Sequence, residues 1–174
     1  MNLSASIIFA SGLSMLAACQ SMPTEPERAN AQLQPTKGSK TFGEATFEDI
    51  EGKVHVVIYV QGLKAGAEHG LHIHEIGDCS SGDGMSTKGH FNPFGMPHAS
   101  HANAQRHAGD LPSLKADKSG RGKVDVVLEG ISVSPGPGSV VGRGLIVHAD
   151  PDDFKTQPTG NSGARIACGV IRAG

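Results

Sequence analysis

Residues 53–61 read KVHVVIYVQ, and this stretch decides the fold class. Every second side chain is apolar and β-branched: Val54, Val56, Ile58 and Val60. Because alternate side chains of a β-strand share one face, the pattern predicts a strand with one buried face. Residues 41–48 alternate in the same way and are followed by a Glu51-Gly52 turn. The two stretches therefore predict neighbouring strands separated by a tight turn.

The same rhythm continues on both sides of this stretch. Further strand signals lie at 71–75, 123–128, 144–148 and 165–171, with a weaker first strand at 30–34. No stretch has the period of an amphipathic helix. The 24 glycines and 10 prolines among 174 residues suit short strands joined by many turns. The sequence thus predicts one all-β domain, a sandwich or barrel of about eight strands.

Two long segments break the strand rhythm. Residues 80–110 are rich in glycine and histidine, and residues 149–164 are polar with two prolines. Loops of this length without secondary structure are uncommon unless they are functional or organised by a metal. We therefore expect the chemistry of the protein in these two segments.

Histidine is the residue type that stands out, with nine in the chain. His72 and His74 lie at alternate positions of a predicted strand, so both imidazoles face the same way and can serve one metal ion. Three histidines and a carboxylate follow in the long segment and suit four-coordinate zinc: His90, His98, His107 and Asp110. His148, at the end of a later strand, can complete the first, imidazole-rich site, which suits copper.

Each histidine also has an ordinary interpretation. A single histidine on a strand is usually a core or surface residue, and a His-x-His pair alone is a weak signal. The combination with a histidine-rich loop that ends in aspartate, and with a distant histidine at a strand end, is much harder to produce by chance. The metal interpretation is therefore the stronger one.

The first residues read as a processing signal. Residues 7–18 form an apolar run too short to span a bilayer, and no charged side chain precedes Glu25. The run ends LAAC at residues 16–19, which resembles the lipobox of bacterial lipoproteins; an ordinary signal peptide with a chance cysteine is the alternative. We expect a signal peptide at 1–18, lipid on Cys19, a flexible tether at 19–28 and the folded domain at 29–174. This predicts a protein of the periplasm and cell envelope, anchored to the outer membrane.

Cysteine usage agrees with export, and the net charge bears on the possible partners. If Cys19 carries lipid, Cys79 and Cys168 remain, and an oxidising compartment favours a disulfide between them over two separate thiols. The formal net charge of −2 gives no reason to expect nucleic acid as a partner. An anionic substrate would need a local positive region on this negative protein.

Four segments carry a family resemblance: GLHIHE at 70–75, GHFNP at 89–93, RHAGD at 106–110 and GARIACGV at 163–170. They resemble the signature segments of the copper/zinc superoxide dismutases. The resemblance runs from about residue 30 to the C-terminus. It implies an eight-stranded Greek-key β-barrel, related to the immunoglobulin-like sandwich, and dismutation of superoxide to oxygen and hydrogen peroxide.

The resemblance also assigns roles to single residues. It places copper on His72, His74, His90 and His148. It places zinc on His90, His98, His107 and Asp110. His90 then bridges the two ions and can carry a proton during catalysis. Arg165 matches the arginine that receives superoxide, Asp152 matches the carboxylate that orients one ligand of each metal, and Cys79 and Cys168 match the disulfide of the family.

Other positions match structural roles or depart from the family. His69 matches a structural histidine, and we expect His55 on the barrel surface and His101 in solvent. The segment from Cys79 to His90 is longer than in the familiar animal enzyme. It contributes to dimer contacts in the family, so a homodimer is an open expectation. Pro158 stands where many relatives have lysine, and Lys155 can replace the lost guiding charge.

A non-enzymatic copper- or zinc-binding relative on the same barrel is the competing hypothesis. Such a protein could lose a copper histidine or the arginine without losing its fold. Here every ligand of both sites and Arg165 are present. The sequence therefore favours the enzyme.

Overall fold

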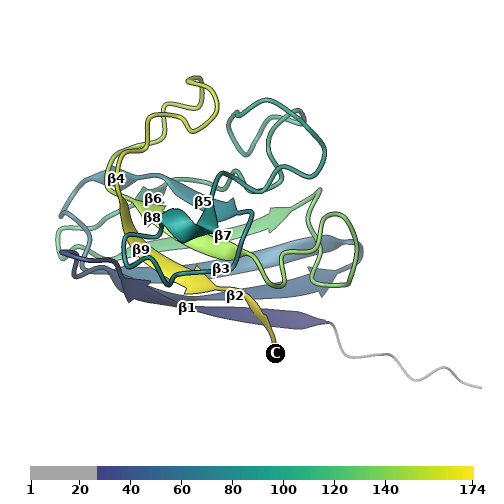
Figure 1. The fold of residues 1–174 in the computed structure, drawn as a ribbon, viewed down its shortest axis with the longest axis horizontal. Helices are drawn as coiled ribbons and strands as arrows, with labels where there is room; N and C mark the ends of the chain where they lie inside the picture. Colours follow the sequence, from purple (N-terminus) through teal and green to yellow (C-terminus); the bar gives the residue numbers. More distant parts are fainter. Residues whose placement is uncertain (1–26) are drawn as a thin grey trace, which may run out of the picture.

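The computed structural model describes residues 27–174, and it is all-β apart from one short 3-10 helix at Met85–Thr87 (Figure 1). The expected signal peptide, Cys19 and the tether up to residue 26 lie outside these residues. Within them, no helix is long and apolar enough to cross a membrane. The strands are β1 Arg28–Pro35, β2 Phe42–Ile50, β3 Lys53–Gln61, β4 Glu68–His69, β5 Leu71–His74, β6 Leu114–Lys115, β7 Gly122–Leu128, β8 Gly144–His148, β9 Arg165–Val170 and β10 Arg172–Ala173.

Eight of the strands form a single curled antiparallel sheet. Its order is β5-β8-β9-β1-β2-β3-β7, with β10 paired to β1, and β4 and β6 form a separate two-stranded sheet. Sequence neighbours pair in β1-β2-β3, whereas β5 and β8 meet only after a long crossover. The all-β fold of about eight strands predicted from the sequence is confirmed.

The β2–β3 hairpin shows why the fold forms. Glu51 and Gly52 both have positive φ, 51° and 80°, as a two-residue hairpin turn requires, and they set Ile50 opposite Lys53. The alternating side chains of β3 then face the core, where they are at most 1% exposed: Val54, Val56, Ile58 and Val60. Their partners on β2, Ala45 and Phe47, are buried on the same side.

The structure extends or adds strands where the sequence signal was weak. β1 begins at Arg28, one residue before the expected domain boundary, and its buried side is made only of Ala29, Ala31 and Leu33. Small residues opposite polar ones give a faint alternation, which explains the weak prediction. β4, β6 and β10 are two residues each, too short for any period to show.

The two long loops lie side by side over one end of the sheet, the teal one after β5 and the yellow-green one after β8 (Figure 1). Gln157 joins them by a reciprocal pair of hydrogen bonds to the backbone of His98. The His98 amide donates to Oε1 and the side-chain Nε2 donates to the His98 carbonyl, each at 2.8 Å. The Gln157 side chain therefore fixes the position of one loop relative to the other.

Candidate metal centre

Two buried strands provide the floor of the site. β5 and β8 pair with His72 opposite Ile146, and Ile73 points to the core with 0% exposure. His72 and His74 therefore share the opposite face, as the strand period predicts. The register of β8 shifts between Val147 and His148, and this bulge leaves the His148 ring 4.9 Å from that of His72.

The loop after β5 is attached to that strand through its backbone. The Phe91 amide donates to the Ile73 carbonyl at 2.8 Å, and the Ile73 amide donates to Gly109 at 2.9 Å. A Cβ atom at Gly109 would lie 2.2 Å from the Ile73 carbonyl oxygen, so only glycine allows this approach. His90 and Asp110, the residues next to these contacts, are thereby brought against His72 and His74.

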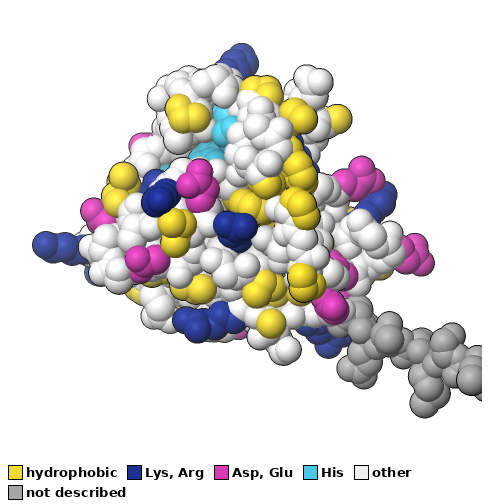
Figure 2. All heavy atoms as spheres, turned by 45° about the vertical axis from the view of Figure 1, so that its right-hand side comes forward, with side chains coloured by type: hydrophobic (Ala, Val, Ile, Leu, Met, Phe, Trp, Pro, Cys, Tyr) yellow, Lys and Arg dark blue, Asp and Glu magenta, His cyan; other side chains and the backbone are white. Residues whose placement is uncertain are grey.

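The structure brings the expected ligands into two groups whose possible ligand atoms lie within 4.8 Å of one another. The first group consists of His72, His74, His90 and His148. The second consists of His90, His98, His107 and Asp110. Every member is buried, and His90 belongs to both groups. In the space-filling view, histidine side chains reach the surface in the recess between the two loops (Figure 2).

In the first group, each imidazole has one nitrogen bonded within the protein and one without a partner. The bonded nitrogens contact Asp152, the Lys88 carbonyl, Asp110 and the Gly163 carbonyl, at 2.7 to 3.2 Å. The nitrogens without a partner are His72 Nδ1, His74 Nε2, His90 Nε2 and His148 Nε2. Buried polar atoms are rarely left unpaired, so four of them in one group fit a bound metal ion.

In the second group, three Nδ1 atoms surround one carboxylate oxygen. Asp110 Oδ1 lies 2.9 Å from His98 Nδ1, 3.0 Å from His90 Nδ1 and 3.5 Å from His107 Nδ1. Asp110 Oδ2 accepts the backbone amides of Ala99 and His107, which holds the carboxylate in place. Three imidazoles and one oxygen are a donor set that suits tetrahedral zinc.

Asp152 connects the two groups from behind. Its Oδ2 lies 2.7 Å from His72 Nε2, and its Oδ1 lies 2.9 Å from His98 Nε2. A Cβ at Gly160 would lie 1.9 Å from Asp152 Oδ1, and Gly160 has a φ of 64°, so the loop must carry glycine there. The position expected to orient one ligand of each group does contact one ligand of each.

Burial sets the protonation state of the first group. It lowers the pKa of His72, His74 and His148, and it lowers the pKa of His90 to about 4. These imidazoles are therefore neutral near pH 7, which is the form that binds metals.

The second group is organised by its carboxylate. Burial alone would raise the pKa of Asp110, but hydrogen bonds from His107, His90 and His98 hold it well below its usual range. Burial opposes charging of His98, but Asp110 and Asp152 on its two nitrogens raise its pKa to about 9. A metal ion at His98 Nδ1 must displace a proton, so its binding weakens in acid.

Comparison with known proteins identifies the family. Residues 41–171 match the model of the copper/zinc superoxide dismutase family. The chain belongs to that family. It is 39% identical to a Cu-Zn superoxide dismutase of Deinococcus radiodurans over 179 residues, covering 95% of this chain and 94% of the relative. It is 38% identical to Cu-Zn superoxide dismutase 2 of Aquifex aeolicus, over 83% of this chain and 86% of the relative.

A solved structure agrees with this assignment. The clock protein EA4 superposes with a TM-score of 0.77 at 39% identity, over 88% of this chain and 98% of the other. The chain is therefore a superoxide dismutase, an oxidoreductase whose cofactors are copper and zinc. The competing hypothesis of a non-enzymatic relative is not favoured.

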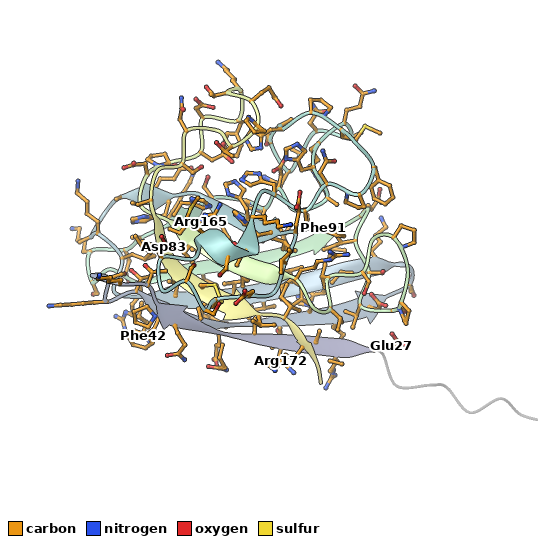
Figure 3. All side chains as sticks on the ribbon, viewed as in Figure 1. Glu27, Phe42, Asp83, Phe91, Arg165 and Arg172 are labelled. Atoms are coloured by element: carbon orange, nitrogen blue, oxygen red, sulfur yellow. A yellow bond between two sulfur atoms is a disulfide. The ribbon has the colours of Figure 1, made fainter. Side chains whose placement is uncertain are left out.

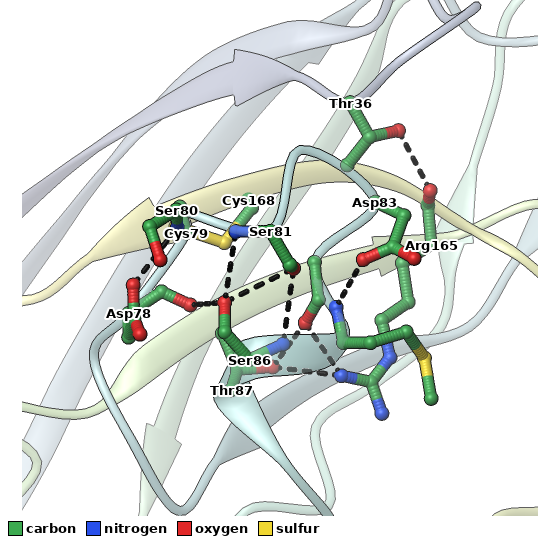
Figure 4. The surroundings of a disulfide bond; sticks show 12 residues. Thr36, Asp78, Cys79, Ser80, Ser81, Asp83, Ser86, Thr87, Arg165 and Cys168 are labelled. Atoms are coloured by element: carbon green, nitrogen blue, oxygen red, sulfur yellow. Dashed lines mark hydrogen bonds between the residues drawn. A yellow bond between two sulfur atoms is a disulfide. The ribbon is translucent and has the colours of Figure 1, made fainter.

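In this superoxide dismutase Arg165 lies beside the first group, directly after the second long loop. Its guanidinium donates to the Gly84 carbonyl at 2.6 Å and to Thr87 Oγ1 at 2.9 Å (Figure 4). It also donates to the Lys88 carbonyl at 2.6 Å. Gly84, with a φ of 79°, packs against the Arg165 stem. Three acceptors on one short segment thus fix the direction of the side chain.

The disulfide ties the same segment to the sheet. Cys79 and Cys168 are bonded across 89 residues of sequence, and Cys168 is on β9 with Arg165 (Figure 4). The predicted disulfide is therefore present in the superoxide dismutase fold. It holds the start of residues 79–88, the segment whose carbonyls bind Arg165.

The remaining histidines differ in their surroundings. His69 is buried and its Nδ1 donates to the His148 carbonyl at 2.9 Å, a supporting contact of the expected kind. His55 is half-buried on the outer face, 2.8 Å from Asp125. The expectation that His101 is in solvent was wrong: it is half-buried, because Arg106 folds back onto its carbonyl.

Sequence reasoning missed two contacts that position the site. Neither the Lys88 carbonyl, which accepts bonds from both His74 and Arg165, nor Gln157 was considered. Every residue type has a backbone carbonyl, so the contact of the Lys88 carbonyl could not be found from the sequence. A positive φ of 61° at Lys88 is visible only in the structure.

Proposed function

We propose that copper lies in the group of His72, His74, His90 and His148, and that zinc lies in the group of His90, His98, His107 and Asp110. The observation that carries this proposal is the set of four buried nitrogens without partners in the first group. A purely imidazole site suits copper, whereas three imidazoles and a carboxylate suit zinc. Both groups are complete within residues 27–174.

Dismutation consumes two superoxide ions and two protons and yields oxygen and hydrogen peroxide. Copper supplies the one-electron redox chemistry when it is bound, and zinc has no redox role. Arg165 offers a fixed positive charge to the anion, because its guanidinium is held by three acceptors. His90 Nδ1 faces the second group, which leaves Nε2 as the atom that can take up and deliver a proton.

Replacing His148 with alanine tests the copper assignment, because His148 belongs only to the first group. We predict that dismutation falls at least about 100-fold, since loss of outer partners of a metal site alone costs 10- to 100-fold. Zinc content, measured by elemental analysis, should stay at the wild-type value. The control is His55→Ala, which removes a histidine from the outer face. Near-normal activity in His148→Ala would contradict the assignment.

We also propose that the enzyme is a lipoprotein of the cell envelope and that it protects this compartment from superoxide. The LAAC sequence supports lipid on Cys19 after removal of residues 1–18, and the Cys79–Cys168 disulfide is of a kind that persists in oxidising compartments. The folded domain begins at Arg28. Residues 20–27 would reach at most about 28 Å from a lipid on Cys19 when extended, so the enzyme would work close to the outer membrane.

Replacing Cys19 with serine tests this proposal. We predict that the protein moves from the membrane fraction to the soluble periplasmic fraction with unchanged specific activity, because the metal groups lie within residues 72–148. Equal recovery in membranes for Cys19→Ser and wild type would contradict lipidation. The soluble variant also serves for sedimentation, where we expect a homodimer. The exposed side chain of Met85, in the segment from Cys79 to His90 that contributes to dimer contacts in the family, supports that expectation.

A further inference from the structure

His90 is the one imidazole of the first group whose far-side partner is itself an expected metal ligand. The other three bond Asp152 or a backbone carbonyl through the nitrogen that faces away from the group. His90 Nδ1 contacts Asp110 Oδ1, and Asp110 belongs to the second group. An ion bound by both residues would replace this contact. His90 then has no hydrogen bond from outside the ligand groups to orient its ring.

The backbone around His90 forms a short ladder with β5. His90 pairs with His74, and the Glu75 amide donates to the Gly89 carbonyl at 3.0 Å. Phe91, the next residue, also bonds to this strand. β5 is the edge strand of the sheet in residues 27–174, so the ladder lies at the margin of the sheet. The side chains that pack against the ladder therefore determine how firmly His90 is held.

Arg143 contacts the two residues that follow these histidines. Glu75 follows His74, and its carbonyl accepts Arg143 Nη1 at 2.7 Å. Phe91 follows His90, and the guanidinium carbon of Arg143 lies 4.3 Å from the centroid of the Phe91 ring. One guanidinium therefore holds both sides of the ladder at once.

The surroundings of Arg143 indicate packing rather than attraction between opposite charges. Among residues 27–174, no carboxylate forms an ion pair with it. Its Nε donates to the Ser139 carbonyl at 3.4 Å, which ties the side chain to the segment before β8. The Phe91 ring that it contacts is only 3% exposed. A planar guanidinium can lie on an aromatic face while it donates hydrogen bonds in its own plane, so this side chain suits a clamp on the ladder.

We propose that Arg143 is the positioning residue of His90 and replaces the outer hydrogen-bond partner that this imidazole lacks. The inference rests on the proposed function, in which His90 serves both metal ions. Arg143 contacts neither metal group and acts through Phe91 and Glu75. Phe91 lies below the long loops and apart from Arg165, so this role is separate from that of the anion-binding arginine (Figure 3).

Three variants and a control test the proposal. Arg143→Met keeps an unbranched apolar stem but removes the donors and the charge, whereas Arg143→Lys keeps the charge. Phe91→Leu removes the ring on which the guanidinium lies. The control is Arg172→Met, which removes an exposed arginine from β10, away from the two loops (Figure 3).

The measurements report on both ions as well as on stability. The EPR spectrum of bound Cu(II) is recorded without zinc and again after zinc is added. Chelator competition gives the affinity for each metal, and thermal unfolding gives Tm. In the wild type, zinc should change the copper spectrum, because both ions share His90 as a ligand. This zinc response reports on the placement of His90 and not on stability.

We expect a smaller zinc response in Arg143→Met and in Phe91→Leu. Copper and zinc affinities should fall about 10-fold, the lower end of the usual cost of losing an outer partner of a metal ligand. Arg143→Lys should lie between Arg143→Met and wild type, because an ammonium can still lie over the ring. Arg172→Met should match wild type. In the double variant of Arg143→Met and Phe91→Leu the losses should be less than additive, because both changes break the same contact.

Several results would overturn the proposal. One is a wild-type zinc response with wild-type affinities in Arg143→Met, since a purely structural role changes Tm alone. Another is an equal loss in Arg172→Met. If Arg143→Met does not fold, a wild-type zinc response in Phe91→Leu decides against the proposal. If zinc leaves the wild-type copper spectrum unchanged, the shared ligand is wrong, and the proposed function fails together with this inference.

Discussion

Each imidazole of the first ligand group is oriented by a bond on its far side, and this is where single residues decide the chemistry. His74 and His148 donate Nδ1–H to backbone carbonyls, so their Nε2 atoms must carry lone pairs. His72 is reversed: Asp152 holds Nε2 and leaves Nδ1 for the ion. The second partner therefore selects which nitrogen faces the metal.

Asp152 is the residue at which both metal groups can be weakened together. Asparagine has the same shape but offers one acceptor in place of two, so His72 or His98 must lose its bond. We predict that Asp152→Asn lowers metal affinity by about 10- to 100-fold, the usual cost of losing an outer partner. Chelator competition for copper and zinc measures it.

The neighbouring carboxylate is a matched control for Asp152→Asn. Asp153 bonds Thr156, Lys155 and Asn161 and contacts no histidine, so Asp153→Asn should leave both affinities unchanged. Equal affinities in the two variants would show that Asp152 does not orient the ligands.

The side chains of both groups could be named from the sequence, but their geometry could not. The spacing of His72 and His74 on a strand requires a shared face, and a histidine-rich loop ending in Asp110 suggests a second set. Which ring nitrogen is free depends on the partners on the far side. Several of these partners are backbone carbonyls, such as that of Lys88. Every residue type has a backbone carbonyl, so the sequence does not reveal them.

Strands long enough to show a repeated alternation of apolar side chains were predictable, and the two-residue strands were not. β3 and β8 have the expected bounds, because their apolar side chains recur over five or more residues. β4 and β6 are two-residue strands that pair with each other across the fold, Glu68 opposite Lys115 and His69 opposite Leu114. The meeting of the two long loops depends on Gln157, a polar loop residue with no distinctive pattern.

As a whole, the molecule is a rigid sheet that carries two loops on one end. Strands contribute His72, His74, His148 and Arg165, and the loops contribute the remaining ligands and Asp152. The disulfide joins the arginine-binding segment to β9, so the substrate side is fixed to the same sheet as the metal side. Arg165 gives this negative protein a fixed local positive charge beside the first group, which suits an anionic substrate.

Anomalous diffraction at the copper and zinc absorption edges tests the central claim most directly, with crystals of enzyme loaded with one equivalent of each metal. We predict a copper peak among His72 Nδ1, His74 Nε2, His90 Nε2 and His148 Nε2, and a zinc peak among His90, His98, His107 and Asp110. His90 should lie between the two peaks. A copper peak in the Asp110 group, or a single shared peak, would contradict the assignment.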